Sequence, residues 1–276
     1  MGRTHCTQGT PLLVEDYVND TGLIICGKCR TRKQHRVEIL GAVRTVSVLC
    51  DCEREAAEAE EAYFQAVAER KRIEGLARDA CTFSHDTAWR EATFARDDGL
   101  NPQASAMCRR YVSSFATMQA ENTGLLFVGP VGTGKSFLAG CVANALLAKG
   151  TSVGVTSLPQ ILYLMRDFSK KDVLEKLQGY ELLVIDDLGT ERETSYAAEQ
   201  VFQVIDARLR TRKPLLVTTN LGLEVMREAN DSIHARVYDR VLEMCPVHVV
   251  LMGRSRRHEV SEKKKVKAAH WLFDGP

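Results

Sequence analysis

The sequence predicts an α/β fold, built on a parallel sheet with helices on both of its faces. The first indication is an apolar run over residues 125–128, typical of a buried strand, which leads into a glycine-rich loop and a helical pattern over 137–149. The second is an apolar run over 182–185 that ends in two acidic residues. Strand-like and helical segments alternate through this region as five strand–helix units, the pattern of a parallel sheet.

The glycine-rich loop has the pattern G-x-x-x-x-G-K-S, which is typical of a site for nucleotide phosphates. Its three glycines let backbone N–H groups turn toward phosphate oxygens, where a Cβ atom would clash. Lys135 reaches the β- and γ-phosphates, and the Ser136 hydroxyl can ligate Mg²⁺. A glycine-rich turn can match this pattern by accident, but the strand before it and the helix after it favour an ATP site. We expect ATP and Mg²⁺ to be contacted by Gly129, Pro130, Val131, Gly132, Thr133, Gly134, Lys135, Ser136 and Phe137.

Composition sets broad limits on the class of protein. The chain has 276 residues, of which 45% are hydrophobic and 26% charged, as in a globular protein with one or two domains. The net charge of +1 neither indicates nor excludes binding to nucleic acid. No run approaches 18 apolar residues, so no membrane contact is expected, and the N-terminus lacks the apolar core of a signal peptide. The expected location is the cytoplasm.

Two cysteine pairs near the N-terminus predict a zinc site. Cys26 and Cys29 form a C-x-x-C motif, and Cys50 and Cys52 follow as C-x-C, a spacing that suits four thiolates around one Zn²⁺. Residues 37–49 between the pairs resemble two short strands joined near a glycine, as in a zinc ribbon, and so small a segment needs a metal to be stable. The alternative is four free buried cysteines. His35 could replace one ligand, but its basic surroundings favour solvated surface. The other cysteines are expected to be small apolar fillers.

Between this module and the glycine-rich loop, the composition predicts mainly helix. Residues 53–78 are rich in Ala, Glu and Arg and form one long helix, whose thin apolar face could pack on the ribbon or a partner, or simply be a solvated connector. Turn signals mark 81–101 as a linker with one short helical turn, and 102–118 is again helical. We therefore expect four parts: a zinc-ribbon-like partner-binding module (1–55), a helix with linker (56–100), an ATPase domain (101–257) and a basic tail (258–276).

Polar residues end two of the predicted buried strands. Asp186 and Asp187 follow the apolar run at 182–185, where a parallel strand delivers carboxylates beside the phosphates. Asp186 would hold Mg²⁺ through water, and Asp187 would orient or deprotonate the attacking water. Asn220 follows the strand predicted at 214–219 and could bind the γ-phosphate or that water. Its alternative role is to cap a helix.

The last part of the chain carries arginines in positions of interest. The helix predicted at 233–244 places Arg236 and Arg240 on one face. The last strand is predicted at 247–252, and it is followed by Gly253-Arg-Ser-Arg-Arg257 and a lysine-rich tail. Surface arginines on a helix usually form ordinary ion pairs, so these residues alone do not define a site.

Five motifs in this order resemble the AAA+ ATPases of the DnaC/IstB group, which includes replicative helicase loaders and ATPase helpers of certain transposons. They are Gly129-Pro-Val-Gly-Thr-Gly-Lys-Ser136, Val184-Ile-Asp-Asp-Leu-Gly189, Ile205-Asp-Ala-Arg208, Thr218-Thr-Asn220 and Arg236-Val-Tyr-Asp-Arg240. The resemblance covers about residues 83–260. A cysteine-rich module ahead of the ATPase is similar to the helicase-contacting zinc domain of some loaders, which favours that half of the group.

The resemblance implies roles for individual residues. Lys135 and Ser136 match the Walker A motif, and Asp186 and Asp187 match Walker B. Asn220 matches sensor 1. Arg240 sits where the group places its arginine finger, which completes a neighbour's ATP site, with Arg236 as second candidate; Arg257 sits at the sensor 2 position. Two departures from the broader AAA+ pattern are Asp187 in place of glutamate, which implies slow hydrolysis, and no evident helical lid after residue 252.

The function implied is an ATP-hydrolysing loader that places a replicative ring helicase onto single-stranded DNA. ATP would bind between subunits of a homo-oligomer, and hydrolysis would trigger release. Arg166, Lys170, Lys171 and the basic tail are weak candidates for contacts with DNA, and a solvated helix end explains the first three equally well. The alternatives are a transposase-helper ATPase that acts on duplex DNA and an ATP-gated adaptor that hardly hydrolyses ATP.

Overall fold

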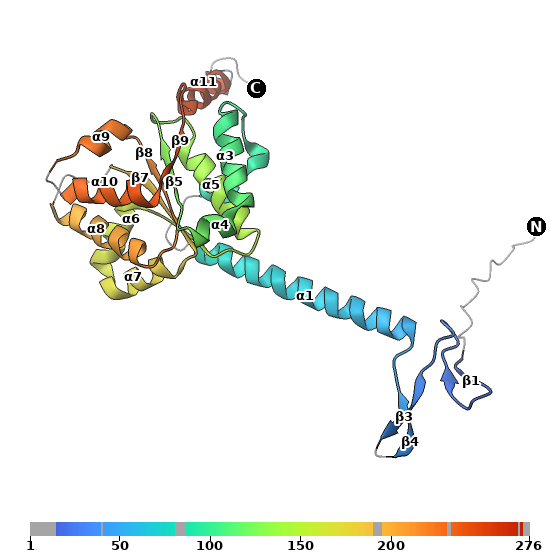
Figure 1. Ribbon diagram of the computed structural model, residues 1–276. Helices are drawn as coiled ribbons and strands as arrows, with labels where there is room; N and C mark the ends of the chain where they lie inside the picture. The colour runs from blue at the N-terminus through green and yellow to red at the C-terminus, as the bar shows by residue number, and fades with distance from the viewer. Residues whose placement is uncertain are drawn as a thin grey trace, which may run out of the picture. The chain divides into compact units, whose positions relative to one another are not determined.

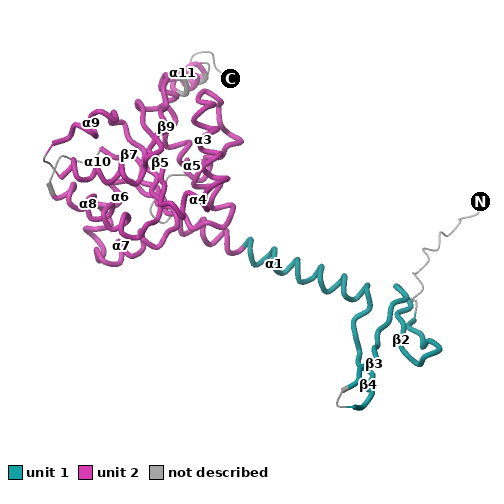
Figure 2. The backbone as a smooth tube through the Cα atoms, viewed as in Figure 1, with its two compact units in different colours: residues 1–70 teal, residues 71–276 magenta. Residues whose placement is uncertain are grey.

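The computed structural model describes residues 15–39, 41–80, 87–189, 195–230, 233–269 and 271–272. The chain divides into two compact units, residues 1–70 and 71–276 (Figure 2). Within the described ranges, no helix has the length and apolarity needed to cross a bilayer.

The first unit consists of two small antiparallel sheets and the beginning of a long helix. Strand β1 (Tyr17–Val18) pairs with β2 (Ile24–Ile25), and β3 (Gln34–Ile39) pairs with β4 (Ala42–Ser47). The turn from β3 to β4 contains Gly41 at a φ of +76°, a left-handed conformation that glycine adopts without steric cost. The two short strands predicted from the sequence are therefore confirmed.

Helix α1 (Asp51–Ala80) is one continuous helix of 30 residues, as its composition predicts. Only some of its apolar side chains pack against other elements. Leu76 and Ala80 pack into the core of the second unit, whereas the rings of Tyr63 and Phe64 lie edge to face, 5.9 Å apart, and stay exposed.

The linker after α1 contains more helix than expected. It holds α2 (Thr87–Glu91) and the 3-10 helix η2 (Phe94–Arg96), and the turn signals at 84–86 lie outside the described residues. The single helix predicted over 102–118 is two helices, α3 (Pro102–Ser113) and α4 (Phe115–Ala120). The break falls at Ser114, whose φ of −103° and ψ of 17° are not helical.

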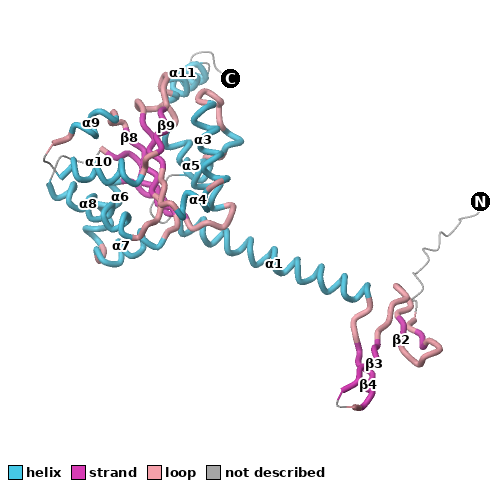
Figure 3. The backbone as a smooth tube through the Cα atoms, viewed as in Figure 1, coloured by secondary structure: helices cyan, strands magenta, loops and turns pink. Residues whose placement is uncertain are grey.

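A five-stranded parallel sheet forms the centre of the second unit (Figure 3). Its strands lie in the order β6, β7, β8, β5, β9, and every neighbouring pair is parallel. The bounds are β5 (Leu125–Val128), β6 (Val153–Ser157), β7 (Leu182–Leu188), β8 (Leu215–Thr219) and β9 (Val247–Val250). The predicted parallel sheet is confirmed, and its order places β7, β8 and β5 next to one another in the middle of the sheet, where their carboxyl ends meet.

Helices cover both faces of this sheet, as Figure 1 shows. Alternate residues of β5 serve the two cores: Leu126 and Val128 join one, and Leu125 and Phe127 join the other. The first core is completed by α6 (Leu158–Asp167), α7 (Lys170–Gly179), α8 (Ser195–Arg210), α9 (Leu223–Glu228) and α10 (Ile233–Met244). The second is completed by α3, α4 and α5 (Lys135–Leu147).

Three further helices differ from the sequence prediction. Helix α7 begins inside the charged run at 166–171, where Ser169 accepts a hydrogen bond from the backbone N–H of Asp172. Helix α9 is a short helix that was not predicted. The basic tail, to which no structure was assigned, forms α11 (Arg256–Ala269).

Candidate nucleotide-binding site

The glycine-rich loop between β5 and α5 depends on positions that only glycine can occupy. Gly132 and Gly134 have φ values of +81° and +98°. A Cβ atom on Gly129 would lie 2.1 Å from the carbonyl oxygen of Leu251, and one on Gly132 would lie 2.0 Å from Ser255 Oγ. The loop therefore turns its backbone inward at the N-terminus of α5, the geometry that binds phosphate.

Lys135 links the loop to the tip of β8. Its ammonium group is buried and donates hydrogen bonds to the carbonyl oxygens of Gly129 (2.7 Å) and Pro130 (2.9 Å) and to Asn220 Oδ1 (2.6 Å). Burial lowers the pKa of Lys135, and the charges of Asp187 and Asp186 oppose this shift. Asn220 is therefore a partner of the phosphate-loop lysine. It does not cap α9, because the residue before that helix is Gly222.

The acidic end of β7 is connected to the same loop through hydroxyl groups. Ser136 Oγ donates to Asp186 Oδ1 at 2.9 Å, and Thr218 Oγ1 donates to the same oxygen at 2.5 Å. Burial raises the pKa of Asp186, and the two hydroxyl donors partly offset this. Thr218 Oγ1 also accepts from the backbone N–H of Asp187 (2.9 Å). Sequence reasoning gave Thr218 no role, although it stands in the Thr218-Thr-Asn220 motif that pointed to Asn220.

These groups surround one cleft of about 440 Å³. It is lined by Val131, Gly132, Gly134, Lys135, Ser136, Phe137, Asp187, Asn220, Arg256 and Arg257. Gly129, Pro130 and Asp186 are tied to this lining by the hydrogen bonds above, and Thr133 Oγ1 donates to the Pro130 carbonyl at 2.9 Å. The structure thus brings the predicted Walker A, Walker B, sensor 1 and sensor 2 positions together, and it adds Arg256, which was not predicted.

The two arginine finger candidates lie elsewhere on α10. Neither is among the described residues that line the cleft. Arg240 is partly exposed and pairs with Asp206 (3.4 Å) and Glu243 (3.8 Å), whereas the guanidinium of Arg236 stacks 4.8 Å from the ring centroid of Phe202. In this arrangement, therefore, neither Arg236 nor Arg240 contacts the cleft in which its own chain would bind phosphate.

The candidate DNA contacts before and within α7 all have local partners. Arg166 pairs with Asp167 (2.9 Å), Lys171 pairs with Glu175 (3.7 Å), and the Lys170 ammonium lies 5.4 Å from the ring centroid of Tyr196. These contacts are equally compatible with a DNA-binding surface and with an ordinary solvated helix end.

Arg208, quoted above only as part of a motif, is a buried structural residue. Its guanidinium donates to the carbonyl oxygens of Tyr180 (2.7 Å), Glu181 (3.0 Å) and Pro214 (2.8 Å). Longer contacts reach the carbonyls of Leu177 and Gln178 at the end of α7. The side chain therefore satisfies backbone groups where α7 ends and where β7 and β8 begin.

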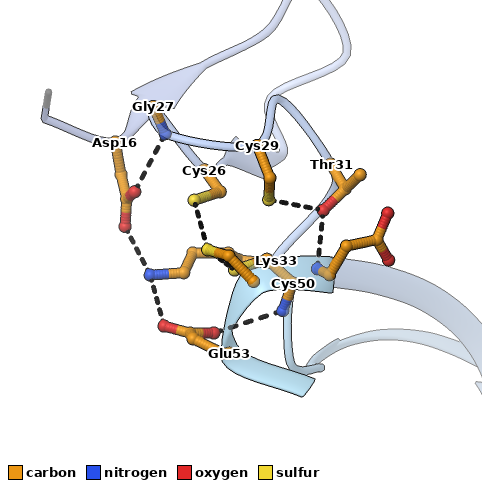
Figure 4. A network of polar contacts seen from close by, with 10 residues as sticks. Asp16, Cys26, Gly27, Cys29, Thr31, Lys33, Cys50 and Glu53 are labelled. Atoms are coloured by element: carbon orange, nitrogen blue, oxygen red, sulfur yellow. Dashed lines mark hydrogen bonds and ion pairs between the residues drawn. The ribbon is translucent and has the colours of Figure 1, made fainter. Parts of the chain in front are cut away.

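In the first unit, the four predicted cysteines form one cluster (Figure 4). Their sulfur atoms lie within 4.8 Å of one another, with Cys26 and Cys52 3.6 Å apart and Cys50 and Cys52 3.3 Å apart. Tetrahedral coordination with Zn–S bonds of about 2.3 Å places sulfur atoms about 3.8 Å apart, so the cluster fits zinc. His35 lies in β3 opposite Val46 and is not part of the cluster.

A second layer of polar contacts holds the cysteine loops in place (Figure 4). Lys33 Nζ bridges Asp16 and Glu53, with 2.7 Å to each carboxylate. Asp16 accepts from the Gly27 backbone N–H, and Glu53 accepts from that of Cys50. One lysine therefore ties the first cysteine pair to the second, as outer-shell partners do in metal sites. Of the isolated cysteines, Cys108, Cys141 and Cys245 are buried, whereas Cys6 and Cys81 lie outside the described residues.

A central parallel sheet with this strand order, a phosphate loop after β5 and acidic residues near the end of β7 define an AAA+ P-loop nucleotide-binding domain. The chain belongs to the family of IstB-like ATP binding proteins, whose model matches residues 49–265.

Several named proteins are similar to it. The replicative helicase loader DnaC of Escherichia coli strain K12 is 30% identical over 167 residues, which span 58% of this chain and 66% of DnaC. The replicative helicase loader DnaI of Bacillus subtilis strain 168 is 26% identical over 184 residues, 60% of this chain and 58% of DnaI. The matches thus span less than two thirds of these curated relatives.

Two solved structures share the fold. A crystal structure of DnaI has a TM-score of 0.53 at 20% identity and covers 63% of this chain and 95% of its own. A crystal structure of the DnaC helicase loader has a TM-score of 0.52 at 23% identity, covering 60% of this chain and all of its own.

Proposed function

We propose that this protein is an ATP-dependent loader that places a replicative ring helicase onto single-stranded DNA. The relatives named above are replicative helicase loaders, and the family is one of ATP-binding proteins. The observation that carries the proposal is the hydrogen-bonded edge at which Lys135 meets Asn220 and Ser136 meets Asp186, beside a cleft of about 440 Å³.

Each residue of this edge has a role in the proposal. The loop glycines and Lys135 bind the ATP phosphates, and Ser136 and Asp186 hold Mg²⁺, which would neutralise charge on the β- and γ-phosphates. Asp187 orients or deprotonates the attacking water, Asn220 contacts that water or the γ-phosphate, and Arg257, which also lines the cleft, binds phosphate. Because Asp186 is buried with a raised pKa, bound Mg²⁺ also compensates its charge.

The proposal requires assembly of several copies of the chain. Arg240 lies outside the cleft of its own chain and is partly exposed, so it is available to a neighbour once its contacts with Asp206 (3.4 Å) and Glu243 (3.8 Å) are exchanged. We assign Arg240 as the finger that completes the neighbouring ATP site, with Arg236 as second candidate. Such an oligomer couples hydrolysis at each interface to release of the helicase.

A mixing experiment tests this assignment. Lys135→Ala should abolish ATP binding, and Arg240→Ala should bind ATP but not hydrolyse it, so each variant alone is inactive. In an equimolar mixture, random assembly forms an intact site from one Arg240→Ala and one Lys135→Ala subunit at about a quarter of the interfaces. Turnover of about a quarter of the wild-type rate is therefore expected, measured as phosphate release with single-stranded DNA present.

The matched control is Arg210→Ala, which removes the other arginine that pairs with Asp206. It should hydrolyse ATP normally without mixing. If Arg240→Ala alone turns over ATP at the wild-type rate, the finger assignment is wrong, and the same mixture made with Arg236→Ala tests the second candidate.

The N-terminal module, residues 1–55 in the sequence-based division, is the proposed contact for the helicase. One Zn²⁺ would be held by Cys26, Cys29, Cys50 and Cys52. The ion would cross-link the module, which is too small to be stabilised by a hydrophobic core alone. The bridge from Lys33 to Asp16 and Glu53 would orient the two cysteine loops around the ion.

Metal analysis of the purified protein should find one zinc per chain, and Cys26→Ser should contain much less. Chelation should make residues 15–50 sensitive to limited proteolysis, because structural zinc contributes roughly 10–16 kcal/mol to the stability of such modules. The ATPase domain should stay resistant and keep its affinity for ATP. Cys108→Ser, which changes a buried cysteine outside the cluster, should leave the zinc content at one.

A second candidate is a transposase-helper ATPase that acts on duplex DNA, because the matching family is described by IstB. The two functions differ in the DNA that stimulates turnover. Stimulation by single strands supports the loader, whereas stimulation by duplex supports the transposase helper. Normal ATP affinity without turnover under either condition would instead support an ATP-gated adaptor.

A further inference from the structure

The turn that follows β9 lies directly on the phosphate loop. The backbone N–H of Arg256 donates to the carbonyl oxygen of Gly132 at 2.9 Å, and Ser255 sits where a side chain on Gly132 would be. Gly132 of the loop thus contacts two residues at the start of α11. The same turn places Arg257 in the lining of the cleft with Lys135.

The side chain of Arg256 is fixed from two sides. Its guanidinium donates through Nη1 to the carbonyl oxygen of Thr133, in the phosphate loop. It also pairs with both carboxylate oxygens of Asp98, through Nη2 to Oδ1 at 2.9 Å and through Nε to Oδ2. Such a two-point contact between guanidinium and carboxylate restricts orientation as well as position.

Asp98 comes from a distant part of the sequence. It lies in the turn between η2 and α3, 158 residues before Arg256. The hydrogen bond from Arg256 lowers the pKa of the Asp98 carboxyl, so the pair is charged at neutral pH. The segment ahead of the ATPase sheet is thereby joined to the phosphate loop through one arginine.

We propose that Asp98 is a positioning residue for the ATP site: it holds Arg256 against the phosphate loop and so directs Arg257 into the cleft. This inference rests on the proposed ATP site and adds a residue to it. Asp98 neutralises Arg256, which leaves Lys135 and Arg257 as the cations that face the phosphates. Without Asp98, the first turn of α11 loses its charged anchor, and only the hydrogen bonds from Arg256 to the carbonyl oxygens of Gly132 and Thr133 hold it against the loop, among the described polar contacts of this turn with the loop.

The test measures the affinity for a fluorescent ATP analogue in the presence of Mg²⁺. Asp98→Asn, which keeps the size of the side chain and removes its charge, should weaken binding about three- to tenfold. Asp98→Glu should restore part of the affinity. The neighbouring Asp97→Asn should bind like the wild type, because Asp97 makes only a local contact of 3.3 Å with the backbone N–H of Gly99 among the described hydrogen bonds.

A double substitution separates positioning from a purely structural role. Arg257→Gln alone should weaken binding, and Asp98→Asn added to it should have no further effect, because Asp98 acts through Arg257. If Asp98 acted only on stability, the losses of affinity from the two substitutions would multiply, and Asp98→Asn would have a lower melting temperature. We expect its melting temperature to be unchanged, because the ion pair between Asp98 and Arg256 is partly exposed.

Two outcomes would overturn the inference. One is a wild-type affinity in Asp98→Asn, and the other is a full, independent loss in the double variant. Both can be told apart from failure of the proposed function, because in that case the wild type itself would not bind the analogue.

Discussion

Replacing Asp187 with asparagine should lower ATP turnover by about 10²- to 10⁴-fold, the usual contribution of a positioned general base. ATP affinity should change little, because Lys135, Ser136 and the loop backbone keep their contacts. Asn is the informative replacement: residue 187 has a φ of +57°, a left-handed conformation that Asp and Asn tolerate better than other side chains. The substitution therefore removes the carboxylate without straining the end of β7.

The measurement is single-turnover hydrolysis together with equilibrium binding of ATP. Asp172→Asn, which changes an exposed acid on α7, is the control and should hydrolyse ATP at the wild-type rate. Retained turnover in Asp187→Asn would show that another group handles the attacking water. The backbone also explains why an aspartate stands where the broader AAA+ pattern has glutamate, since a left-handed residue here favours the shorter side chain.

Replacing Arg208 with alanine should lower the free energy of unfolding by about 3–5 kcal/mol, because each buried carbonyl group that loses its partner costs about 1–3 kcal/mol. The carbonyl oxygens of Tyr180, Glu181 and Pro214 would lose the guanidinium as a donor, and a cavity would open where α7 ends beside the sheet. Burial lowers the pKa of Arg208 to about 10, so the charge is retained at neutral pH.

Urea unfolding of the full chain measures this effect. The matched control is Arg210→Ala, two residues along the same helix, where the side chain is 80% exposed and pairs with Asp206. Loss of such an exposed pair costs about 0–1 kcal/mol. Equal stability of the two variants would mean that water replaces the guanidinium without cost, against the role assigned to Arg208.

Local patterns in the sequence predicted the elements whose formation depends on nearby residues alone. Strand β5 and helix α10 begin and end where the apolar periodicity places them, and the cysteine spacing predicted a cluster that forms. The missed helices α7 and α9 are short. The charges of 166–171 hide the boundary of α7, and α9 has only six residues.

The candidate site divides in the same way. Lys135 and Asn220 come after β5 and β8, and Asp186 lies near the carboxyl end of β7. Because these are neighbouring parallel strands, their carboxyl ends meet, and so do the three side chains. The contact between Asp98 and Arg256 joins residues 158 positions apart, and the carbonyl groups around Arg208 come from two segments, residues 177–181 and Pro214. Neither leaves a periodic signal in the sequence, because each depends on tertiary packing.

Because Lys135 already donates hydrogen bonds within the protein, nucleotide binding exchanges these bonds for bonds to phosphate. A phosphate that enters the loop competes with the carbonyls of Gly129 and Pro130 and with Asn220 Oδ1 for the same ammonium protons. The measured affinity for ATP is then the difference between two sets of contacts. When Asn220 loses its hydrogen bond with Lys135, its amide becomes available to the γ-phosphate or to water. Binding of nucleotide therefore changes the contacts at the end of β8, the strand that lies between β5, which leads into the phosphate loop, and β7, which carries the acidic residues.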